Sequence, residues 1–245
     1  MTVEETIELV RQRTFHFSIQ SAQGEAWSAT CFYMARLVPS GRIIVATARH
    51  AIEFSGATTI DWVFRRFAED GKCVGELKFT TNDSEEAKRP YRFYKLADVG
   101  FIVLPPRDYA SQGELVPPGL EPLPVLHETR RITPGTRVGW AGFPATVQQY
   151  LGRPTLCYFE GTVSAFHASG SRGLYLVDGH NSRGVSGGPV FHWREDDRRP
   201  EIAGIVSAYG CADADLPGLC VFEPINPIIG FLVSQYGKGS KEAQG

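Results

Sequence analysis

Short apolar runs, separated by turn residues at intervals of roughly 8 to 15 residues, are the strongest constraint on the fold of this chain. Five of these runs have the length and composition of strands: 42–47, 60–65, 98–104, 174–177 and 202–207. The 245 residues include 26 glycines and 16 prolines for turns, and they suffice for one large domain or two compact halves. Short strands at such regular spacing predict an all-β sandwich or barrel.

Helical patterns occur at the two ends of the chain. Thr2 and Glu5 have the spacing of a capping box ahead of an apolar face, which predicts a short N-terminal helical extension over 1–14. Apolar residues recur at helical spacing across 224–237, after a proline and before a glycine. We therefore expect a C-terminal helix over 224–237 and a polar tail or linker over 238–245.

Prolines concentrate in the middle of the chain. Six of them lie between positions 105 and 124, more than a helix interior or a central strand accommodates. We interpret 111–133 as the connection between two halves of the molecule. The first half is predicted to cover 15–110 and the second half 134–223.

The charge balance argues against two classes of partner. The chain carries 25 Lys and Arg against 27 Asp and Glu, a net charge of −2, and no basic cluster that would bind nucleic acid or an anionic membrane. No stretch approaches the roughly 18 apolar residues of a membrane span. The N-terminus also lacks the basic and apolar regions of a secretory signal. We expect no nucleic-acid partner and no membrane partner.

The cysteines indicate a reducing compartment. There are five, an odd number, and they are scattered without a Cys-x-x-Cys pair or a His/Cys cluster at metal-ligand spacing. This pattern favours free thiols, a cytoplasmic location and no bound metal. A disulfide between Cys211 and Cys220 stays open as the alternative for an exported form.

A serine flanked by glycines lies between two strand-like runs. The segment 184–189 reads Gly-Val-Ser-Gly-Gly-Pro, and its glycines allow a tight loop that exposes the Ser186 hydroxyl and the neighbouring N–H groups. That geometry suits a nucleophile. The alternative is an ordinary turn, because glycine and proline punctuate loops in most proteins.

A histidine and an aspartate stand at the ends of two other runs. His50 follows the run 42–47, and Asp98 opens an apolar run typical of a strand buried on both faces. A serine becomes nucleophilic when an imidazole takes its proton and a carboxylate orients that imidazole. Taken singly, His50 also fits a histidine making one hydrogen bond, and Asp98 a strand or turn cap. Asp61, inside an alternating strand, and Asp83, in a charged loop, are weaker candidates for the carboxylate.

The order of these three residues and the motifs around them resemble the trypsin-like (chymotrypsin-family) serine proteases. The segment 47–50 resembles their histidine motif, 98–104 their aspartate strand and 184–189 their serine loop. The segment 204–207 resembles the strand that lines their substrate cleft. The segment 138–144 is similar to the strand that opens the second barrel in bacterial HtrA-type members.

The resemblance implies an all-β fold of two six-stranded antiparallel β-barrels with the site between them. It further implies a serine endopeptidase without a cofactor, in which His50 and Asp98 come from the first barrel and Ser186 from the second. The N–H groups of Gly184 and Ser186 would form the oxyanion hole.

The resemblance also implies where a substrate binds. The backbone of Ser207, Ala208 and Tyr209 would pair with an extended peptide by strand addition. His180, six residues before Ser186, takes the position at the base of the pocket for the side chain that precedes the cleaved bond. Without a carboxylate there, cleavage after Lys or Arg is not expected. His180 would accept a polar or acidic side chain, or it would simply cap the loop.

Two departures from the family pattern concern how the expected protease activity would be regulated. Val185 stands where many secreted members carry an acid that pairs with a newly cut N-terminus, so that route of activation is not expected. The cysteines that bracket the histidine in extracellular members are also missing. We expect a regulated intracellular protease of protein or peptide substrates, with an oxyanion loop that is formed constitutively or ordered by a regulatory partner or sensor domain. The alternative is a catalytically inactive module that binds peptides.

Overall fold

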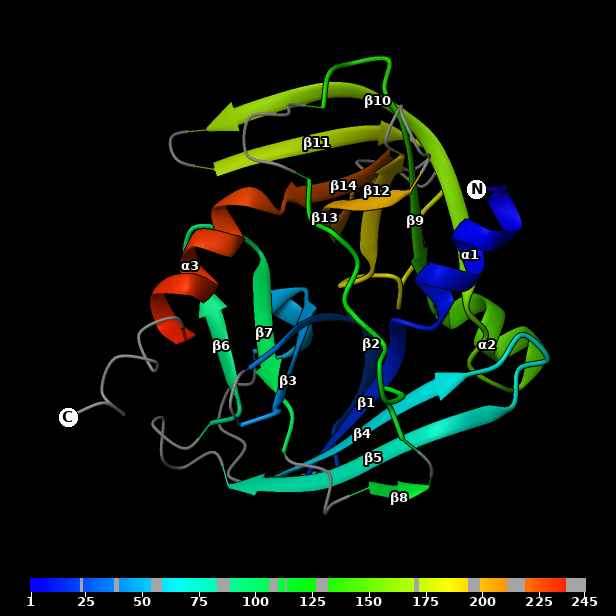
Figure 1. Cartoon of the computed structure of the whole chain (residues 1–245), viewed down its shortest axis with the longest axis vertical. Helices are drawn as coiled ribbons and strands as arrows, with labels where there is room; N and C mark the ends of the chain where they lie inside the picture. The colour runs from blue at the N-terminus through cyan, green and yellow to red at the C-terminus, as the bar shows by residue number, and fades with distance from the viewer. Residues whose placement is uncertain are drawn as a thin grey trace.

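The structure is a computed structural model of the whole chain (Figure 1). It describes residues 1–22, 24–37, 40–53, 59–82, 89–105, 110–112, 114–126, 132–169, 172–193, 199–210 and 219–236. The predicted tail at 238–245, Asp83 and Cys211 lie outside these ranges.

The first half of the molecule is built on one antiparallel sheet of eight strands in the order β6-β7-β3-β2-β1-β4-β5-β8 (Figure 1). The strands are β1 (Thr14–Ser21), β2 (Ala26–Arg36), β3 (Ile43–Thr47), β4 (Thr59–Phe67), β5 (Cys73–Asn82), β6 (Tyr91–Tyr94), β7 (Val99–Val103) and β8 (Ala110–Gln112). Strand β3 pairs with β7 so that Thr47 lies opposite Gly100. The C-terminal end of β3 therefore meets the N-terminal end of β7.

The second half is a closed antiparallel barrel of six strands in the order β10-β11-β14-β13-β12-β9. These are β9 (Arg137–Gly142), β10 (Cys157–Ser169), β11 (Arg172–Asp178), β12 (Pro189–Trp193), β13 (Pro200–Gly210) and β14 (Leu219–Pro224). The register between β13 and β14 shifts from Val206 opposite Phe222 to Ala208 opposite Val221. Ser207 is thus the extra residue of a β-bulge.

The predicted all-β fold with two halves is confirmed, and the second half is the expected six-stranded barrel, whereas the first half differs in its strand count. Its sheet has eight strands where six were expected. The edge strands β6 and β8 contain four and three residues, too few for an alternating pattern to be recognised in the sequence. Within the proline-rich connection, Val125 forms a parallel bridge with Ile202 of β13.

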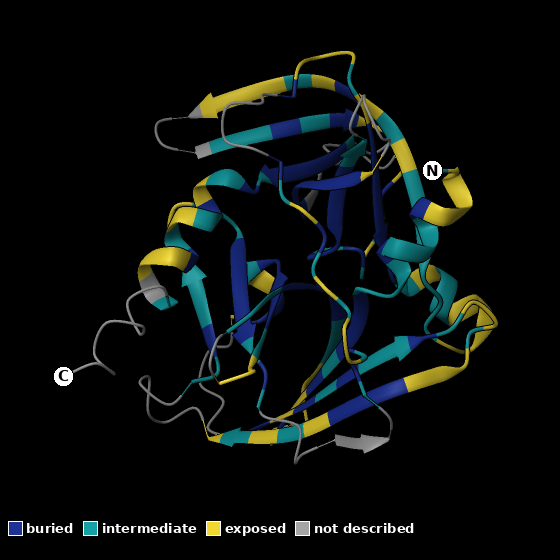
Figure 2. Ribbon diagram, in the orientation of Figure 1, coloured by how far each residue is buried: buried dark blue, intermediate teal, exposed yellow. Residues whose placement is uncertain are grey.

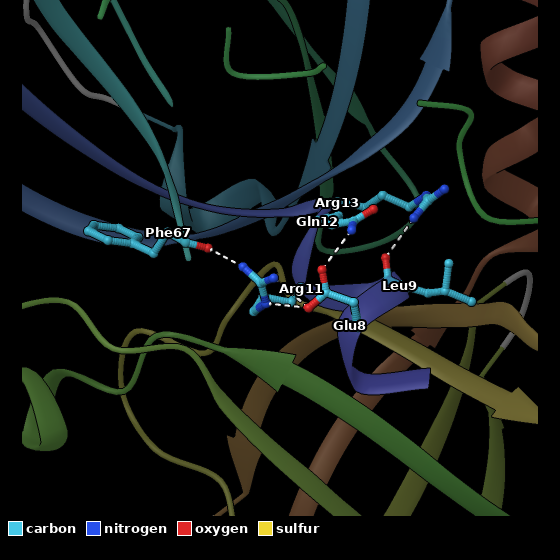
Figure 3. Close-up of polar contacts among 6 residues, drawn as sticks. All are labelled: Glu8, Leu9, Arg11, Gln12, Arg13 and Phe67. Carbon is cyan, nitrogen blue, oxygen red and sulfur yellow. Dashed lines mark hydrogen bonds and ion pairs between the residues drawn. The ribbon is translucent and has the colours of Figure 1, made fainter. Parts of the chain in front are cut away.

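Three α-helices accompany the strands: α1 (Val3–Arg11), α2 (Ala145–Leu151) and α3 (Asn226–Tyr236). The capping box is present, since Thr2 accepts from the N–H of Glu5 and the Glu5 side chain accepts from the N–H of Thr2. Figure 3 shows how α1 is tied to β4: Arg11 pairs with Glu8 and donates from Nη1 to the carbonyl of Phe67 at 2.8 Å. The helices at both ends agree with the sequence pattern, whereas α2 was not predicted.

The two halves share part of their hydrophobic core. Each half has a cluster of its own, and a third cluster contains Phe101 of β7 and Ile205 of β13 together with Val10 of α1 and Leu232 of α3. Figure 2 shows the buried strands of both halves facing the middle of the molecule. The two end helices therefore pack over the boundary between the two halves, which we call the seam. This packing fixes the positions of the two halves relative to each other.

Candidate active site

His50 and Asp98 form a two-point contact at the neighbouring ends of β3 and β7. His50 lies in a 3₁₀ turn, η1 (Arg49–Ala51), that begins two residues after β3 ends. Its Nδ1 donates to Asp98 Oδ2 at 2.7 Å, and its backbone N–H donates to Asp98 Oδ1 at 3.0 Å. The N–H of Arg49 also donates to the Asp98 carbonyl at 3.2 Å. One carboxylate thus fixes both the turn and the ring that the turn carries.

The contact with Asp98 raises the pKa of the His50 ring. The hydrogen bond to Asp98 raises the pKa of His50 above its usual value, while partial burial works in the opposite direction. The His50 side chain is 53% exposed and that of Asp98 is 22% exposed, so the ring remains accessible to another molecule. With the proton held on Nδ1, the neutral ring presents Nε2 as a hydrogen-bond acceptor.

A second carboxylate supports Asp98 from the opposite half of the molecule. Glu223 of β14 is 1% exposed, and its Oε1 accepts from the backbone N–H of Asp98 at 3.3 Å. This bond crosses the seam at the point where β7 begins. Glu223 was not predicted as a site residue, because nothing in the local pattern of β14 links it to a residue 125 positions earlier.

The loop of Ser186 is pressed against the first half of the molecule. Gly187 has a φ of +86°, and a Cβ placed on it would lie 2.1 Å from Thr47 Oγ1 and 2.2 Å from the Thr30 carbonyl. Only glycine tolerates both the left-handed backbone and the close approach. Because Thr47 ends β3 shortly before the turn of His50, the serine loop and the histidine turn lie side by side.

Thr30 of β2 binds the serine loop through backbone and side chain. Its N–H donates to the Ser186 carbonyl at 3.1 Å, and its Oγ1 donates to the Gly184 carbonyl at 2.7 Å. The same oxygen accepts from the N–H of Phe143 at 3.0 Å, and the Thr30 carbonyl accepts from Thr47 Oγ1 at 2.7 Å. One residue of the first half therefore holds the loop at two points, a role the sequence did not reveal.

The two N–H groups predicted to form the oxyanion hole have no acceptor among the described residues. The N–H groups of Gly187 and Gly188 donate to Val206 and Val185, whereas those of Gly184 and Ser186 make no hydrogen bond there. Neighbouring free donors on a constrained loop suit a site where negative charge develops.

Strand β13 offers a free edge beside this loop. Strand β12 pairs with β13 only as far as Ile205, and 208–210 are paired on one side by β14 alone among the described strands. Ser207 is 1% exposed, and its Oγ has no hydrogen-bond partner among the described residues. The backbone of Ala208 and Tyr209 follows in this strand, and their side chains lie outside the described part. An extended peptide could continue the sheet here.

His180 and Val185 differ in how far they are exposed. His180 is exposed in the segment that follows β11, next to the buried Asn181. Val185 is fully buried in the core of the second barrel.

Of the weaker carboxylate candidates, Asp61 accepts from Thr80 Oγ1 of β5 and is thus engaged away from His50.

The described ranges contain neither a candidate metal site nor a candidate membrane-spanning helix. There, no group of three or more His, Cys, Asp and Glu side chains is placed to hold a metal ion. No helix in those ranges is long and apolar enough to cross a membrane. Cys220 is a free, buried thiol, and Cys211, its partner in the alternative disulfide, lies outside the described residues.

Comparison with known proteins identifies the fold. No family model matches the chain, and no curated protein matches it. The chain is similar in structure to a serine endoprotease from Yersinia pestis, with a TM-score of 0.60 and 14% sequence identity over 98% of this chain and 68% of that one. The chain therefore has the fold of the trypsin-like serine proteases.

Proposed function

We propose that the protein is a serine endopeptidase that uses Ser186 as nucleophile, His50 as general base and Asp98 as the group that orients His50. The observation that carries this proposal is the two-point contact between Asp98 and His50, with Nδ1 2.7 Å from Oδ2. A carboxylate in this position fixes the tautomer of the imidazole and stabilises the imidazolium that forms during the reaction. The close approach of the serine loop to Thr47 supports the same assignment.

The reaction proceeds through an acyl-enzyme. Ser186 Oγ attacks the peptide carbonyl carbon while His50 Nε2 takes the hydroxyl proton, and the N–H groups of Gly184 and Ser186 stabilise the oxyanion. The carbon–nitrogen bond breaks as Nε2 gives its proton to the leaving amine. Water then attacks the ester with the same base, the carbon–Oγ bond breaks, and the proton returns to Ser186.

A substrate would bind as an added strand along Ser207, Ala208 and Tyr209. The unpaired edge of β13 supports this mode, because it gives an extended peptide main-chain partners next to the loop of Ser186. We further propose that His180 lies in the pocket for the side chain before the cleaved bond and favours a polar or acidic residue. A peptide library in which cleavage follows only aromatic or small aliphatic residues would contradict this preference.

We place the enzyme in the cytoplasm under the control of a regulatory partner or sensor domain. Four free cysteines among the described residues support a reducing compartment. Burial raises the pKa of the Cys220 thiol to about 12, so this group stays protonated and unreactive. With Val185 buried in the core, activation by a new N-terminal ammonium group has no acceptor at that position.

The test compares wild type with Ser186→Ala, using a fluorophosphonate probe and an unfolded protein substrate. We expect labelling and cleavage by wild type and neither by Ser186→Ala. The matched control is Ser182→Ala, four residues earlier, whose hydroxyl donates only to the Arg183 carbonyl and whose loss should change neither readout. Labelling that persists in Ser186→Ala, or that is absent from wild type with and without a partner, would contradict the proposal.

The alternative is a module that captures peptides without cutting them. The free edge of β13 favours it, since strand addition needs no nucleophile. In that case wild type and Ser186→Ala would bind an extended peptide with the same affinity, and wild type would leave it intact over long incubation.

A further inference from the structure

A pocket lined by arginines lies in the first half of the molecule, remote from the candidate active site. Its volume is about 710 Å³. Four parts of the chain meet there: the β2–β3 turn, strand β5, the segment that leads into β6, and the end of β7, with the last described residue of α3 at the rim. The residues that line it are Leu37, Ser40, Arg42, Phe79, Thr80, Thr81, Arg89, Pro90, Arg92, Val103, Leu104, Pro105 and Tyr236. We call it the arginine pocket.

The described charged residues that line the arginine pocket are all arginines. Arg42, Arg89 and Arg92 line it, and none of the described lining residues is Asp or Glu. No carboxylate pairs with Arg42 or Arg92 within the described ranges. In a chain whose net charge is −2, the guanidinium groups of Arg42 and Arg92 create a local attraction for anions.

The pocket combines this charge with partial preorganisation. Arg92 Nη1 donates to the carbonyls of Arg89 and Tyr91 at 2.6 and 2.7 Å, which holds the guanidinium group in place and leaves Nε and Nη2 without an acceptor among the described residues. The Arg89 guanidinium lies 5.9 Å from the centre of the Tyr91 ring. A guanidinium fixed in this way presents a planar fork of donors that matches phosphate oxygens.

The remaining lining is mixed, with aromatic and apolar residues beside the hydroxyl-bearing Ser40, Thr80 and Thr81. Phe79 and Tyr236 contribute rings, and Pro90 and Pro105 contribute apolar surface. A pocket of this volume is in the range that takes a small molecule, roughly 300 to 1,000 Å³. The ligand that fits has several negative charges at one end and a flat, weakly polar body at the other.

We propose that the arginine pocket binds a small organic phosphate of the nucleoside phosphate class. The phosphates contact Arg42 and Arg92, and the base packs against the aromatic and proline side chains. A nucleic-acid strand is a poorer match, because the chain has a net charge of −2 and its sequence contains no basic cluster.

The site is separate from the peptide cleft. Arg42 precedes β3 and Val103 ends β7, whereas His50 and Asp98 lie at the opposite ends of these same strands. Each strand has five residues, so the two sites are about 16 Å apart along the strands. A bound nucleotide would leave the edge of β13 free for substrate.

The test is calorimetric titration of the full-length chain with ATP, tripolyphosphate and adenosine as probes. We expect wild type to bind ATP most tightly, tripolyphosphate more weakly and adenosine not measurably. The double variant Arg42→Gln/Arg92→Gln should bind ATP at least about tenfold more weakly, since two charge-assisted contacts are lost. The single variant Arg42→Gln, changed at an exposed turn residue, should show a smaller loss in the same direction.

The control removes two arginines elsewhere. Arg137→Gln/Arg153→Gln lowers the net charge by the same amount in the second half and should bind ATP like wild type. Thermal melting of every variant shows that it is folded. Three results would overturn the inference: no binding of ATP or tripolyphosphate at millimolar concentration, equal affinity of the double variant and wild type, or adenosine binding as tightly as ATP. None of these readouts depends on peptidase activity.

Discussion

His50 and Asp98 hold each other within the first half of the molecule, whereas the loop of Ser186 in the second half is held by residues of the first. The imidazole and the carboxylate are placed by strand pairing, because β3 and β7 lie side by side and their ends carry the two residues. The loop of Ser186 is instead fixed from outside by Thr30. The contact between His50 and Asp98 therefore forms within one sheet. The complete site also requires the contacts that join the two halves across the seam.

This difference separates two kinds of damage. A change at the pair should harm the chemistry and leave the seam intact. A change at a seam contact should harm both the chemistry and the cohesion of the two halves. Four substitutions test this division.

Asp98→Asn is expected to have the largest effect, a loss of about 10⁴-fold in kcat/KM, the size that this change has in such triads. The amide no longer fixes the productive tautomer of His50. Because the bond to Asp98 raises the pKa of His50, its loss should also move the acidic limb of the pH–rate profile to lower pH. Steady-state kinetics between pH 5 and 9 measure both.

Asp61→Asn is the matched control for this change. Its carboxylate is engaged with Thr80, so neither rate nor profile should move. If the acidic limb of the pH–rate profile of Asp98→Asn stays at the wild-type pH, a group other than Asp98 sets the pKa of His50.

Thr30→Val removes one hydroxyl from the seam without a change in shape. The N–H of Phe143 and the carbonyl of Gly184 lose their partner, at about 1–3 kcal/mol for each group left unpaired. We expect a loss of about 100-fold in kcat/KM from displacement of the oxyanion donors, together with a lower free energy of unfolding in urea. Thr30→Ser keeps the hydroxyl and should stay near wild type; equal loss in both variants would assign the effect to packing.

Glu223→Leu should cost about tenfold in kcat/KM and about 1–3 kcal/mol in the free energy of unfolding, because the N–H of Asp98 loses its acceptor. Glu223→Gln keeps an oxygen in the same place and should recover most of both. The low-field NMR signal of the His50 Nδ1 proton reports the contact directly, and it should weaken in the leucine variant only. If glutamine and leucine behave alike, the negative charge of Glu223 matters and its hydrogen bond does not.

His16→Phe is expected to have the smallest effect at neutral pH. His16 of β1 is 2% exposed, its ring lies 5.4 Å from that of Phe143 across the seam, and neither ring nitrogen has a partner. Burial, with a smaller contribution from Arg65, lowers the pKa of His16 to about 4.

The unfolded chain therefore binds a proton more readily than the folded protein between pH 6.5 and 4. Stability present above pH 6.5 should be lost across this range, by up to about 3 kcal/mol. Urea unfolding at pH 7 and at pH 4.5 should show this loss in wild type and not in His16→Phe. A parallel decline in both proteins would place the acid-sensitive group elsewhere.

Sequence alone predicted the pieces that local pattern encodes. The capping box of Thr2 and Glu5 and the apolar runs of β3 and β7 gave helix and strand positions close to those observed. His50, Asp98 and Ser186 stood out because each lies at the end of such a run or on a glycine loop. Each of these features can be recognised from a stretch of only a few residues.

The parts that sequence did not reveal are contacts between distant segments. Thr30 is one polar residue inside a strand, and Glu223 is one carboxylate before a proline, so neither carries a local mark of its partner. Helix α2 was missed for a different reason: it buries none of its residues, and Pro144 at its start provides no side-chain cap. Without an apolar face, seven residues give no periodic signal.

The bond from Asp98 to Glu223 has a consequence for how the proposed enzyme comes into being on the ribosome. The first sheet can pair its strands while the second barrel is still being translated, and the 88 residues from Asp98 to Ser186 take roughly 4 to 18 s at about 5–20 residues per second. During that interval the nascent chain holds His50 and Asp98 but lacks Ser186, and β14 emerges later still. The order of synthesis would therefore delay the proposed hydrolysis until the serine loop has been made.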